Sequence, residues 1–266
     1  MTTDIDVRPQ QRAPLARYRH SLWLLTRRDL RVRYSTSVLG YLWSILDPLV
    51  MSGIYYFVFT VIFHRSVGED PYIVFLLAGL LPWMWFNGSV SDCTRAFLRD
   101  AKLVRSTTIP RTIWVNRIVL SKGIEFIASL PVLALFAIFA GATLGWGVLL
   151  FPLAVALQAV LTVGIGLIVA PLVVFFRDLE RAVKLILRFL FYATPIIYSV
   201  ENIPEGLRPW AALNPLSGIF GLYRAAFFPT EFNPLFTLAS AVISLALLGV
   251  GILVFRRTVR AVLKEI

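Results

Sequence analysis

The chain has 266 residues, of which 58% are hydrophobic and 15% charged, and its mean hydropathy is +0.76. Soluble domains are about half apolar and a quarter charged, so this composition excludes an ordinary soluble globular protein. The net charge of +11 fits either a nucleic-acid ligand or the anionic inner leaflet of a membrane, and only the positions of the charges distinguish the two.

The N-terminal segment, residues 1–20, is polar and precedes every apolar run, so no cleavable signal peptide is expected. We expect a disordered cytoplasmic arm there. The following stretch, "TRRDLRVRYSTSVLGYLW", contains Arg27, Arg28 and Arg31, which fall within one arc of a helical wheel, with Asp29 and Arg33 spaced as an i,i+4 ion pair. This pattern predicts an amphipathic interfacial helix over residues 21–38. From the residues alone, a topogenic anchor is favoured over a helix that binds a specific anionic group.

Several apolar runs are long enough to cross a bilayer, which needs roughly 20 residues per helix. They predict an all-α polytopic membrane protein with six transmembrane helices, near residues 41–64, 72–92, 117–140, 148–176, 184–200 and 235–255.

The first two of these spans contain polar and aromatic candidates for a channel or a sugar-facing surface. Asp47 could face a polar channel or lie shallow enough to reach water, and the residues favour neither interpretation. Aromatic rings suit the apolar faces of sugars, but filling space between helices is their commoner use. The candidates are Tyr41, Asp47, Trp83, Trp85, Phe86 and Asn87.

The loop "LRDAKLVRSTTIPR" after the second span predicts a short helix that carries Leu98, Leu103 and Val104 as an apolar knob among charges. Such a knob suits docking to a cytoplasmic partner, although a solvated loop is the alternative. In the third span, Lys122 and Glu125 are spaced for an i,i+3 pair with a structural role.

Between the fifth and sixth spans, "NIPEGLRPWAALNPLSGIFGLYRAAFF" is too apolar for a free loop and too broken for a crossing helix. It predicts two short re-entrant or interfacial helices. The notable residues of this region are Trp210, Asn214, Pro215, Tyr223 and Arg224.

Basic residues are concentrated before residue 40 and in residues 95–113, 177–188 and 256–264. The positive-inside rule therefore places both termini in the cytoplasm, and the basic charge faces membrane lipids instead of nucleic acid. No lysine follows a glycine, so the chain has no Walker A phosphate loop. We expect no enzyme activity and no cofactor in this chain. Alternatives that stay open are a small-molecule or lipid exporter and a membrane enzyme acting on polyprenyl-linked sugars.

Five stretches together resemble the membrane subunit of ABC-2 type exporters, specifically the Wzm/TagG polysaccharide-export permeases. They are "RRDLRVRYSTSVLGYLWSILDPL", "GLLPWMWFNGSVS", "KLVRSTTIPR", "VVFFRDLERAVKLILRFLFYATPIIYSVENIPEGLR" and "LNPLSGIFGLYRAAFF". The resemblance implies an ABC-2 transmembrane domain over residues 39–266 in the bacterial inner membrane. It also implies a homodimer with two ABC ATPase subunits, which would bind the ATP and Mg²⁺.

The resemblance further implies that the N-terminal helix is a gate helix which contacts a lipid-linked pyrophosphate, and it reverses the preference for an anchor. The implied contacts are Trp23, Arg27, Arg28, Arg31, Arg33 and Tyr34. The loop after the second span would be the coupling helix, with Arg99, Asp100, Lys102, Leu103, Val104 and Arg105 at the ATPase. Among such relatives the chain most resembles actinobacterial exporters of a lipid-linked galactan, the arabinogalactan precursor, or O-antigen-type exporters. The expected carrier is of the undecaprenyl or decaprenyl type. Asp47 departs from the pattern expected of the family, which leaves its role open.

Overall fold

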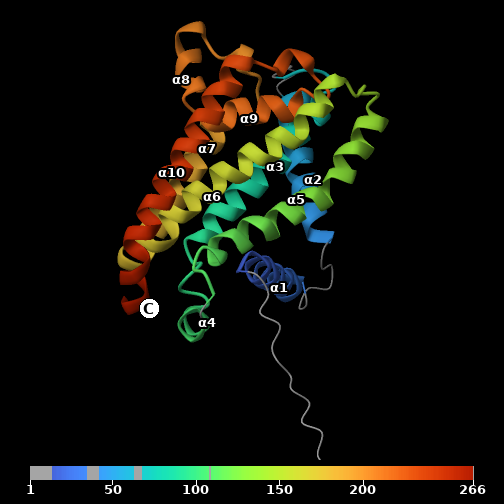
Figure 1. Cartoon of the computed structure of the whole chain (residues 1–266). Helices are drawn as coiled ribbons and strands as arrows, with labels where there is room; N and C mark the ends of the chain where they lie inside the picture. The colour runs from blue at the N-terminus through green and yellow to red at the C-terminus, as the bar shows by residue number, and fades with distance from the viewer. Residues whose placement is uncertain (1–13, 35–41, 63–67, 108, 266) are drawn as a thin grey trace, which may run out of the picture.

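The computed structural model describes residues 14–34, 42–62, 68–107 and 109–265, and every regular element in these ranges is helical (Figure 1). The predicted channel candidate Tyr41 lies outside the described residues. The main helices are α1 (Pro14–Tyr34), α2 (Trp43–Tyr56) with a π-helical continuation (Phe57–Ile62), α3 (Tyr72–Cys93), α4 (Ala101–Ser106), α5 (Ile113–Phe139), α6 (Phe151–Phe175), α7 (Leu179–Ala193), α8 (Arg208–Ala212), α9 (Pro215–Arg224) and α10 (Pro234–Glu265). Short 3₁₀ turns lie at Trp146–Leu150, Val200–Asn202, Glu205–Leu207 and Pro229–Glu231.

Within the described ranges, four helices are long and apolar enough to cross a membrane: Tyr72–Cys93, Ile113–Phe139, Trp146–Phe175 and Pro234–Glu265. They match four of the six predicted spans. The first and fifth predicted spans correspond to α2 with its π-helical continuation and to α7, which are shorter. The count of six therefore stays a prediction, while the all-helical membrane architecture is confirmed.

The fifth predicted span, residues 184–200, is wrong in its position. Helix α7 begins at Leu179 and ends at Ala193, so its 15 residues extend about 22 Å along the helix axis. The end has a local cause, because Thr194 precedes Pro195, and a residue before proline is disfavoured in the helical region. Thr194 is accordingly extended, with φ −94° and ψ 140°.

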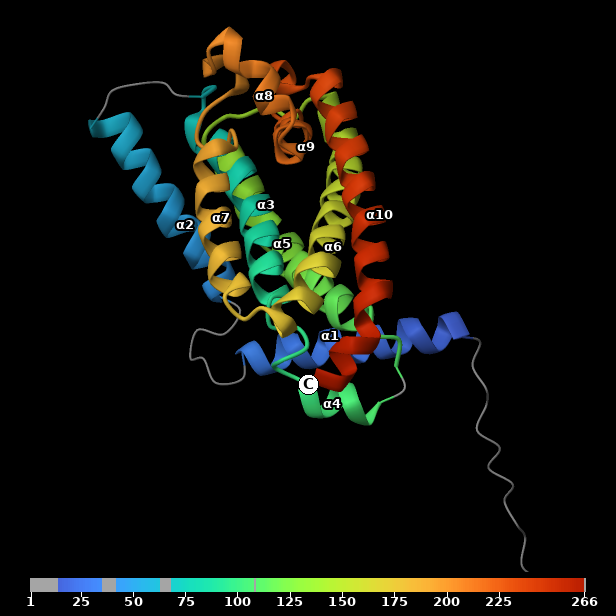
Figure 2. The same ribbon diagram turned by 90° about the vertical axis from the view of Figure 1, so that its left-hand side faces the viewer.

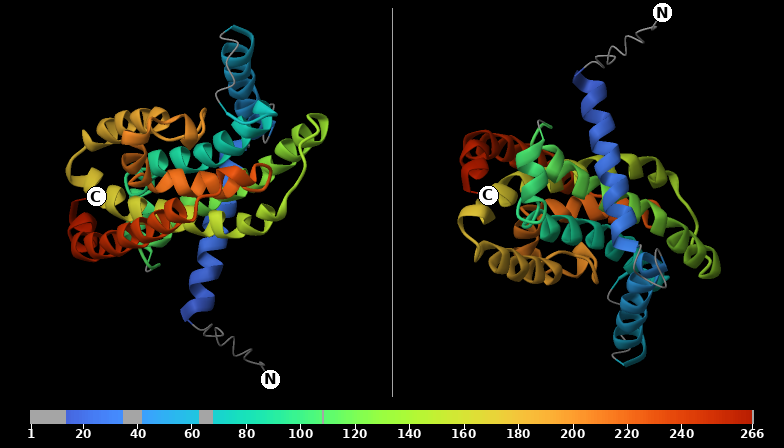
Figure 3. Two further views of the ribbon diagram at one scale, coloured as in Figure 1. Left: turned by 90° about the horizontal axis from the view of Figure 1, so that it is seen from above. Right: turned by 90° about the horizontal axis from the view of Figure 1, so that it is seen from below.

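Helix α1 lies across one end of the bundle, roughly at right angles to the long helices (Figure 2). Seen from below, it crosses the whole width of that end (Figure 3). It packs mainly on α5, where Asn116 donates a 2.7 Å hydrogen bond to the hydroxyl of Tyr18, and its Thr26 side chain is buried. The amphipathic helix predicted over residues 21–38 therefore exists, but it starts at Pro14, so residues 14–20 are helical and not part of a disordered arm.

Helix α3 forms the centre of the bundle, with α2, α5, α6, α7 and α9 packed around it. Helices α6 and α10 make the most extensive contact between two described helices, and glycine allows their backbones to approach closely. A Cβ atom built on Gly164 would lie 2.7 Å from the backbone nitrogen of Leu248, and one built on Gly251 would overlap the carbonyl oxygen of Gly164. Small residues at helix contacts are the usual means by which membrane helices pack closely.

The chain between α7 and α10 forms the end of the bundle opposite α1, where the two short helices α8 and α9 lie (Figure 1). The sequence predicted two short segments here. Helix α9 is buried almost throughout, whereas α8 is largely exposed. Whether these helices re-enter the membrane stays a prediction.

The glycine contact predicts a position-specific effect within α10. Replacing Gly251 with alanine should lower the midpoint of thermal unfolding in detergent, because forcing extra atoms into a packed contact costs about 1–3 kcal/mol. Gly249→Ala is the matched control, since a Cβ atom there meets nothing within 4 Å. Alanine favours a helix by about 1 kcal/mol over glycine, so the control should be neutral or slightly stabilising. Equal midpoints for the two variants would contradict the α6–α10 packing.

Candidate functional site

A charged cluster centred on Arg117 of α5 lies at the end of the bundle that α1 crosses. We call this cluster the Arg117 clamp. The Arg117 side chain is 2% exposed, and its guanidinium donates to Asp29 of α1 at 2.9 Å and to Asp100, just before α4. Arg28 of α1 also donates to Asp100, at 2.6 Å. The guanidinium of Arg117 further stacks over the ring of Trp114, at 4.8 Å from its centroid. The clamp thus joins α1, α4 and α5.

The pKa values of the two carboxyl groups of the clamp are shifted in opposite directions. Burial raises the pKa of Asp29, and the positive charges of Arg117 and Arg28 oppose that rise. Burial also acts to raise the pKa of Asp100, but the hydrogen bond from Arg28 and the charge of Arg117 outweigh it and hold this pKa below its usual range. Asp100 is therefore ionised at neutral pH and forms a full ion pair with both arginines.

A second charged cluster lies one helical turn further along α1. Arg33 donates to both carboxylate oxygens of Glu125 on α5, at 2.9 and 3.1 Å, and to Asp92 on α3, at 2.9 Å. Lys122 lies 3.3 Å from Glu125, which confirms the predicted i,i+3 pair. The predicted pair of Asp29 with Arg33 is wrong: because α1 packs on the bundle, each residue finds a partner on another helix instead.

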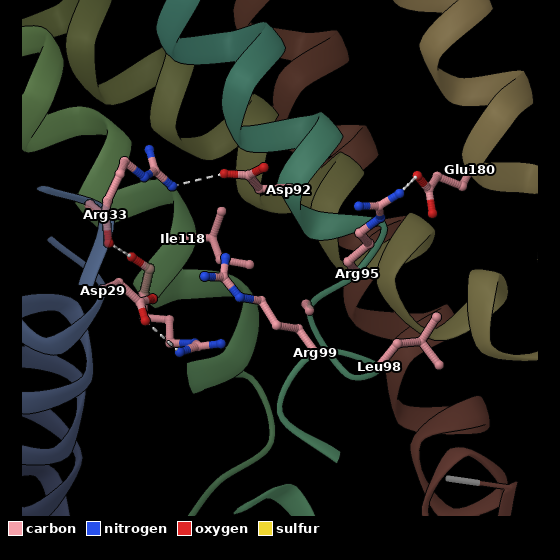
Figure 4. A pocket seen from close by; sticks show the side chains of 11 residues that line it. Asp29, Arg33, Asp92, Arg95, Leu98, Arg99, Ile118 and Glu180 are labelled. Atoms are coloured by element: carbon pink, nitrogen blue, oxygen red, sulfur yellow. Dashed lines mark hydrogen bonds and ion pairs between the residues drawn. The ribbon is translucent and has the colours of Figure 1, made fainter. Parts of the chain in front are cut away.

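Between these clusters lies a pocket of about 510 Å³, lined from α1, α3, α5, α7 and the turn after α3. Figure 4 shows Arg33 pointing to Asp92, and Arg95 pointing to Glu180 of α7, 2.5 Å away. The lining residues are Asp29, Arg33, Asp92, Arg95, Ala96, Leu98, Arg99, Arg117, Ile118, Ser121 and Glu180. The lining holds four arginines and three carboxylates, and Arg33, Arg95 and Arg117 are already paired. An anion in this pocket would therefore be bound mainly by the remaining guanidinium, through charge-assisted hydrogen bonds.

Arg99 is the lining arginine that no ion pair joins to another described residue. Its side chain runs towards the α1 side of the pocket (Figure 4). The contact of Arg99 with the ATPase, which the family resemblance implies, stays a prediction; in the structure Arg99 is exposed and lines this pocket.

The structure divides the predicted gate arginines into two pairs. Arg28 and Arg33 are engaged in the two charged clusters, whereas Arg27 and Arg31 are exposed. Trp23 is 54% exposed. Tyr34 is the last residue of α1, and its side chain is outside the described part of the structure.

The predicted coupling segment is helical, as α4, but its apolar knob is not as expected. Val104 is fully buried and belongs to the hydrophobic core, so it is not presented to a partner. Leu103 is half-buried, while Lys102 and Arg105 are exposed. Asp100 is engaged in the clamp. The outward surface of α4 is therefore basic, because its apolar side chains anchor it to the bundle.

The aromatic candidates of α3 are packed inside the chain. Trp83, Trp85 and Phe86 are 6%, 5% and 1% exposed, and the indole N–H of Trp85 donates to the carbonyl of Val119 at 3.0 Å. Their packing role, the commoner of the two interpretations, is the one this burial supports. Asn87, which also belongs to the candidate set, is half-buried, and Asp47 on α2 is exposed.

At the opposite end, Arg224 is fully buried and donates to the carbonyls of Pro195, at 2.8 Å, and Ile196, at 2.5 Å. Its guanidinium lies 3.6 Å over the ring of Phe75 and 3.5 Å from Glu231.

The other residues predicted in this region divide between the core and the surface. Asn214 caps α9 through the backbone nitrogen of Leu216, and Pro215 is the first residue of that helix. Tyr223 is 2% exposed and Trp210 is 70% exposed.

Sequence reasoning missed the partners that complete these clusters. Arg117, Asp92 and Glu231 were not singled out. The available signal was a charged residue inside or beside an apolar run, since such a residue needs a partner in a folded membrane protein.

The fold and the charged pocket define a polytopic integral membrane protein with a helix lying across one end, and the comparisons name its class. The chain belongs to the ABC-2 type transporter family, which it matches over residues 20–228.

Named relatives include O-antigen export permeases and a polysialic acid transport protein. The chain is 36% identical to an O-antigen export system permease protein RfbA of Klebsiella pneumoniae, over 80% of this chain and 82% of that protein. It is 33% identical to RfbA of Myxococcus xanthus, over 85% and 88% of the two chains. It is 27% identical to the polysialic acid transport protein KpsM of Escherichia coli, over 83% and 89%.

The Arg117 clamp predicts a large effect on stability. Arg117→Gln leaves two carboxylates without their buried partner, and breaking a buried pair in this way costs about 3–5 kcal/mol. Because Asp29 and Asp100 are 21% and 11% exposed, we expect the lower end of that range in a detergent-unfolding measurement. Arg95→Gln is the control, since Arg95 is 62% exposed and water screens its pair with Glu180, so the loss of stability should be small. A loss of similar size in both variants would argue against the clamp.

Proposed function

We propose that this chain is the membrane-spanning subunit of an ATP-driven exporter that moves a lipid-linked polysaccharide from the cytoplasm across the inner membrane. The observation that carries the proposal is the full-length similarity to permeases of O-antigen and capsule-type export, which spans at least four fifths of each chain. The helix lying across the bundle end, over a pocket lined by arginines, supports a substrate that carries a phosphate group.

In this proposal α1 is a gate helix whose arginines have two separate tasks. Arg28 and Arg33 hold the helix on the bundle through the clusters described above. Arg27 and Arg31 are exposed and receive the diphosphate of an undecaprenyl- or decaprenyl-type carrier. Trp23 contributes an exposed aromatic ring at the membrane interface, where such rings are commonly found.

The proposal includes a homodimer and two copies of an ABC ATPase, which bind ATP and Mg²⁺. Helix α4 projects at the same end as α1 and the C-terminal end of α10 (Figure 1), and the basic segments of the chain are concentrated there. The positive-inside rule makes this the cytoplasmic end. The exposed side of α4, with Lys102 and Arg105, would contact the ATPase. A galactan or an O-antigen-like polymer is the proposed cargo.

The direct test is depletion of the protein in its host, followed by chemical identification of the glycolipid that accumulates. We expect a polyprenyl diphosphate-linked polysaccharide on the cytoplasmic side and loss of the corresponding polymer from the cell surface. Normal surface polymer after depletion, with no accumulated glycolipid, would rule out the proposed function.

The ATPase contact can be tested by charge reversal on α4. Lys102→Glu with Arg105→Glu should abolish co-purification of the ATPase and stop export while the chain still inserts, because both side chains are exposed. Arg256→Glu with Arg257→Glu reverses two exposed charges near the end of α10 and should leave the complex intact. If the α4 variant still co-purifies the ATPase and exports polymer, the contact lies elsewhere.

The gate assignment predicts that lysine cannot replace the exposed arginines of α1. Arg27→Lys with Arg31→Lys keeps the charge but loses the planar, bidentate donor, so export should fall by about tenfold or more at unchanged expression. Arg17→Lys with Arg19→Lys, two exposed positions on the same helix, should leave export unchanged. Export rates measured side by side would contradict the gate assignment if both double variants behaved alike.

A further inference from the structure

Helix α7 has three faces of different chemistry. One face, with Val183 and Leu187, is buried against the bundle. A second face is apolar and exposed, with Ile186 and Phe189 at 55% and 70% exposure. At 100° per residue, Arg181, Lys184 and Arg188 fall on a third, exposed face, which we call the basic stripe.

The ends of the stripe can be placed against α3, which runs antiparallel to α7. Glu180 pairs with Arg95 just beyond the end of α3, and the ring of Phe191 packs on Trp83, at 5.5 Å, near the middle of α3. Arg188 lies eight residues from Glu180, which is about 12 Å along the helix. It is therefore within one turn of the level of Trp83, near the midplane of the long helices.

An arginine at that depth is not expected to face lipid chains. Its cost at the centre of a transmembrane helix is about 2.5–3.5 kcal/mol even on insertion scales, and such residues face a wet cavity or a charged partner. Neither Arg181 nor Arg188 has an ion-pair partner among the described residues, whereas Lys184 lies 2.6 Å from Glu180. The basic stripe therefore contains two arginines, Arg181 and Arg188, that can bind an anion from outside the described part of the chain.

The stripe is also continuous with the pocket under α1. Glu180 lines that pocket and is the residue to which Lys184 is paired, so the positive charges rise directly from the pocket wall. Tyr192, one turn above Arg188 on the same face, is 61% exposed and ends the stripe with a hydroxyl group.

We propose that the basic stripe of α7 binds the diphosphate of the lipid-linked substrate after it leaves the pocket, and so conducts this anionic group across the inner half of the membrane. The inference rests on the proposed export function and assigns a substrate-binding role to Arg181 and Arg188. The match is one of charge, since a diphosphate carries several negative charges and guanidinium groups bind phosphate oxygens bidentately.

The test uses the full chain in phosphatidylcholine vesicles and two probes, undecaprenyl diphosphate and undecaprenol, which lacks the phosphates. The wild-type chain should bind the diphosphate in preference to the alcohol. Arg188→Gln should weaken binding of the diphosphate by about tenfold and leave binding of the alcohol unchanged, and Arg188→Lys should be intermediate. Arg257→Gln on α10, also exposed, should bind like the wild type.

The outcomes separate this inference from the function on which it rests. If the wild type prefers the diphosphate and Arg188→Gln binds it equally well, the stripe is not a substrate site and the export function stands. If the wild type shows no preference, both fail. Adding phosphatidylglycerol should compete only weakly; abolition of diphosphate binding by this lipid would make the stripe a site for lipid headgroups and overturn the inference.

A final experiment tests whether Arg188 instead pairs with an acidic residue of a second copy of the chain. Asp47 is the exposed acidic residue of α2, so a second copy could offer it to Arg188. Loss of export in Arg188→Asp that is restored by adding Asp47→Arg would show such an ion pair and overturn the assignment. We expect no restoration, because the charge reversal in the stripe would still repel the diphosphate.

Discussion

The buried guanidinium of Arg117 is the interaction on which the arrangement of this end of the molecule depends. It is held from two directions by Asp29 and Asp100, and these carboxylates belong to segments with different proposed tasks: one on the gate helix and one beside the coupling helix. Both partners must stay in place, because leaving a buried arginine unpaired costs about 3–5 kcal/mol of folding free energy. Helices α1 and α4 therefore cannot separate without breaking ion pairs of this cluster. Arg117 links the two helices through both carboxylates, and Arg28 of α1 also pairs directly with Asp100 beside α4.

The same logic explains why the arginines of α1 are not equivalent. A helix that lies across a bundle needs anchors, and Arg28 and Arg33 are used for this. Arg27 and Arg31 on the exposed side stay available for other anions. This arginine-rich segment thus contains both paired arginines that attach the helix and exposed arginines, and its sequence pattern alone does not distinguish them.

The parts of the structure that a bilayer imposes could be predicted from the sequence. Uncharged runs of sufficient length must be helical in a membrane, so α3, α5 and α6 were located closely. The start of α10 was also located, but this helix ends at Glu265 and not near residue 255. The amphipathic pattern located α1, although its first turns were missed because residues 14–20 are polar. The end of α7 was predictable from Pro195 and was nevertheless placed seven residues too late.

Contacts between helices could not be predicted in this way. The pairing of Arg33 with Glu125, and of Arg117 with Asp29, depends on how α1 crosses α5, and nothing local in the sequence encodes that crossing. Val104 was misjudged for a similar reason, since a valine among charges becomes a core residue when the short helix folds back on the bundle. The roles proposed for single residues on α1, α4 and α7 also cannot be predicted from local sequence, because they depend on partners outside this chain.

Where α7 stops, the carbonyls of Pro195 and Ile196 have left the helix, and the guanidinium of Arg224 supplies their donors. One side chain from α9 thereby replaces the backbone hydrogen bonds that a longer helix would have made. Helix α9 is consequently attached, through Arg224, to the residues that follow α7 and to Phe75 of α3. Separating α9 from the end of α7 would therefore break the hydrogen bonds of Arg224 and part its buried charge from Glu231.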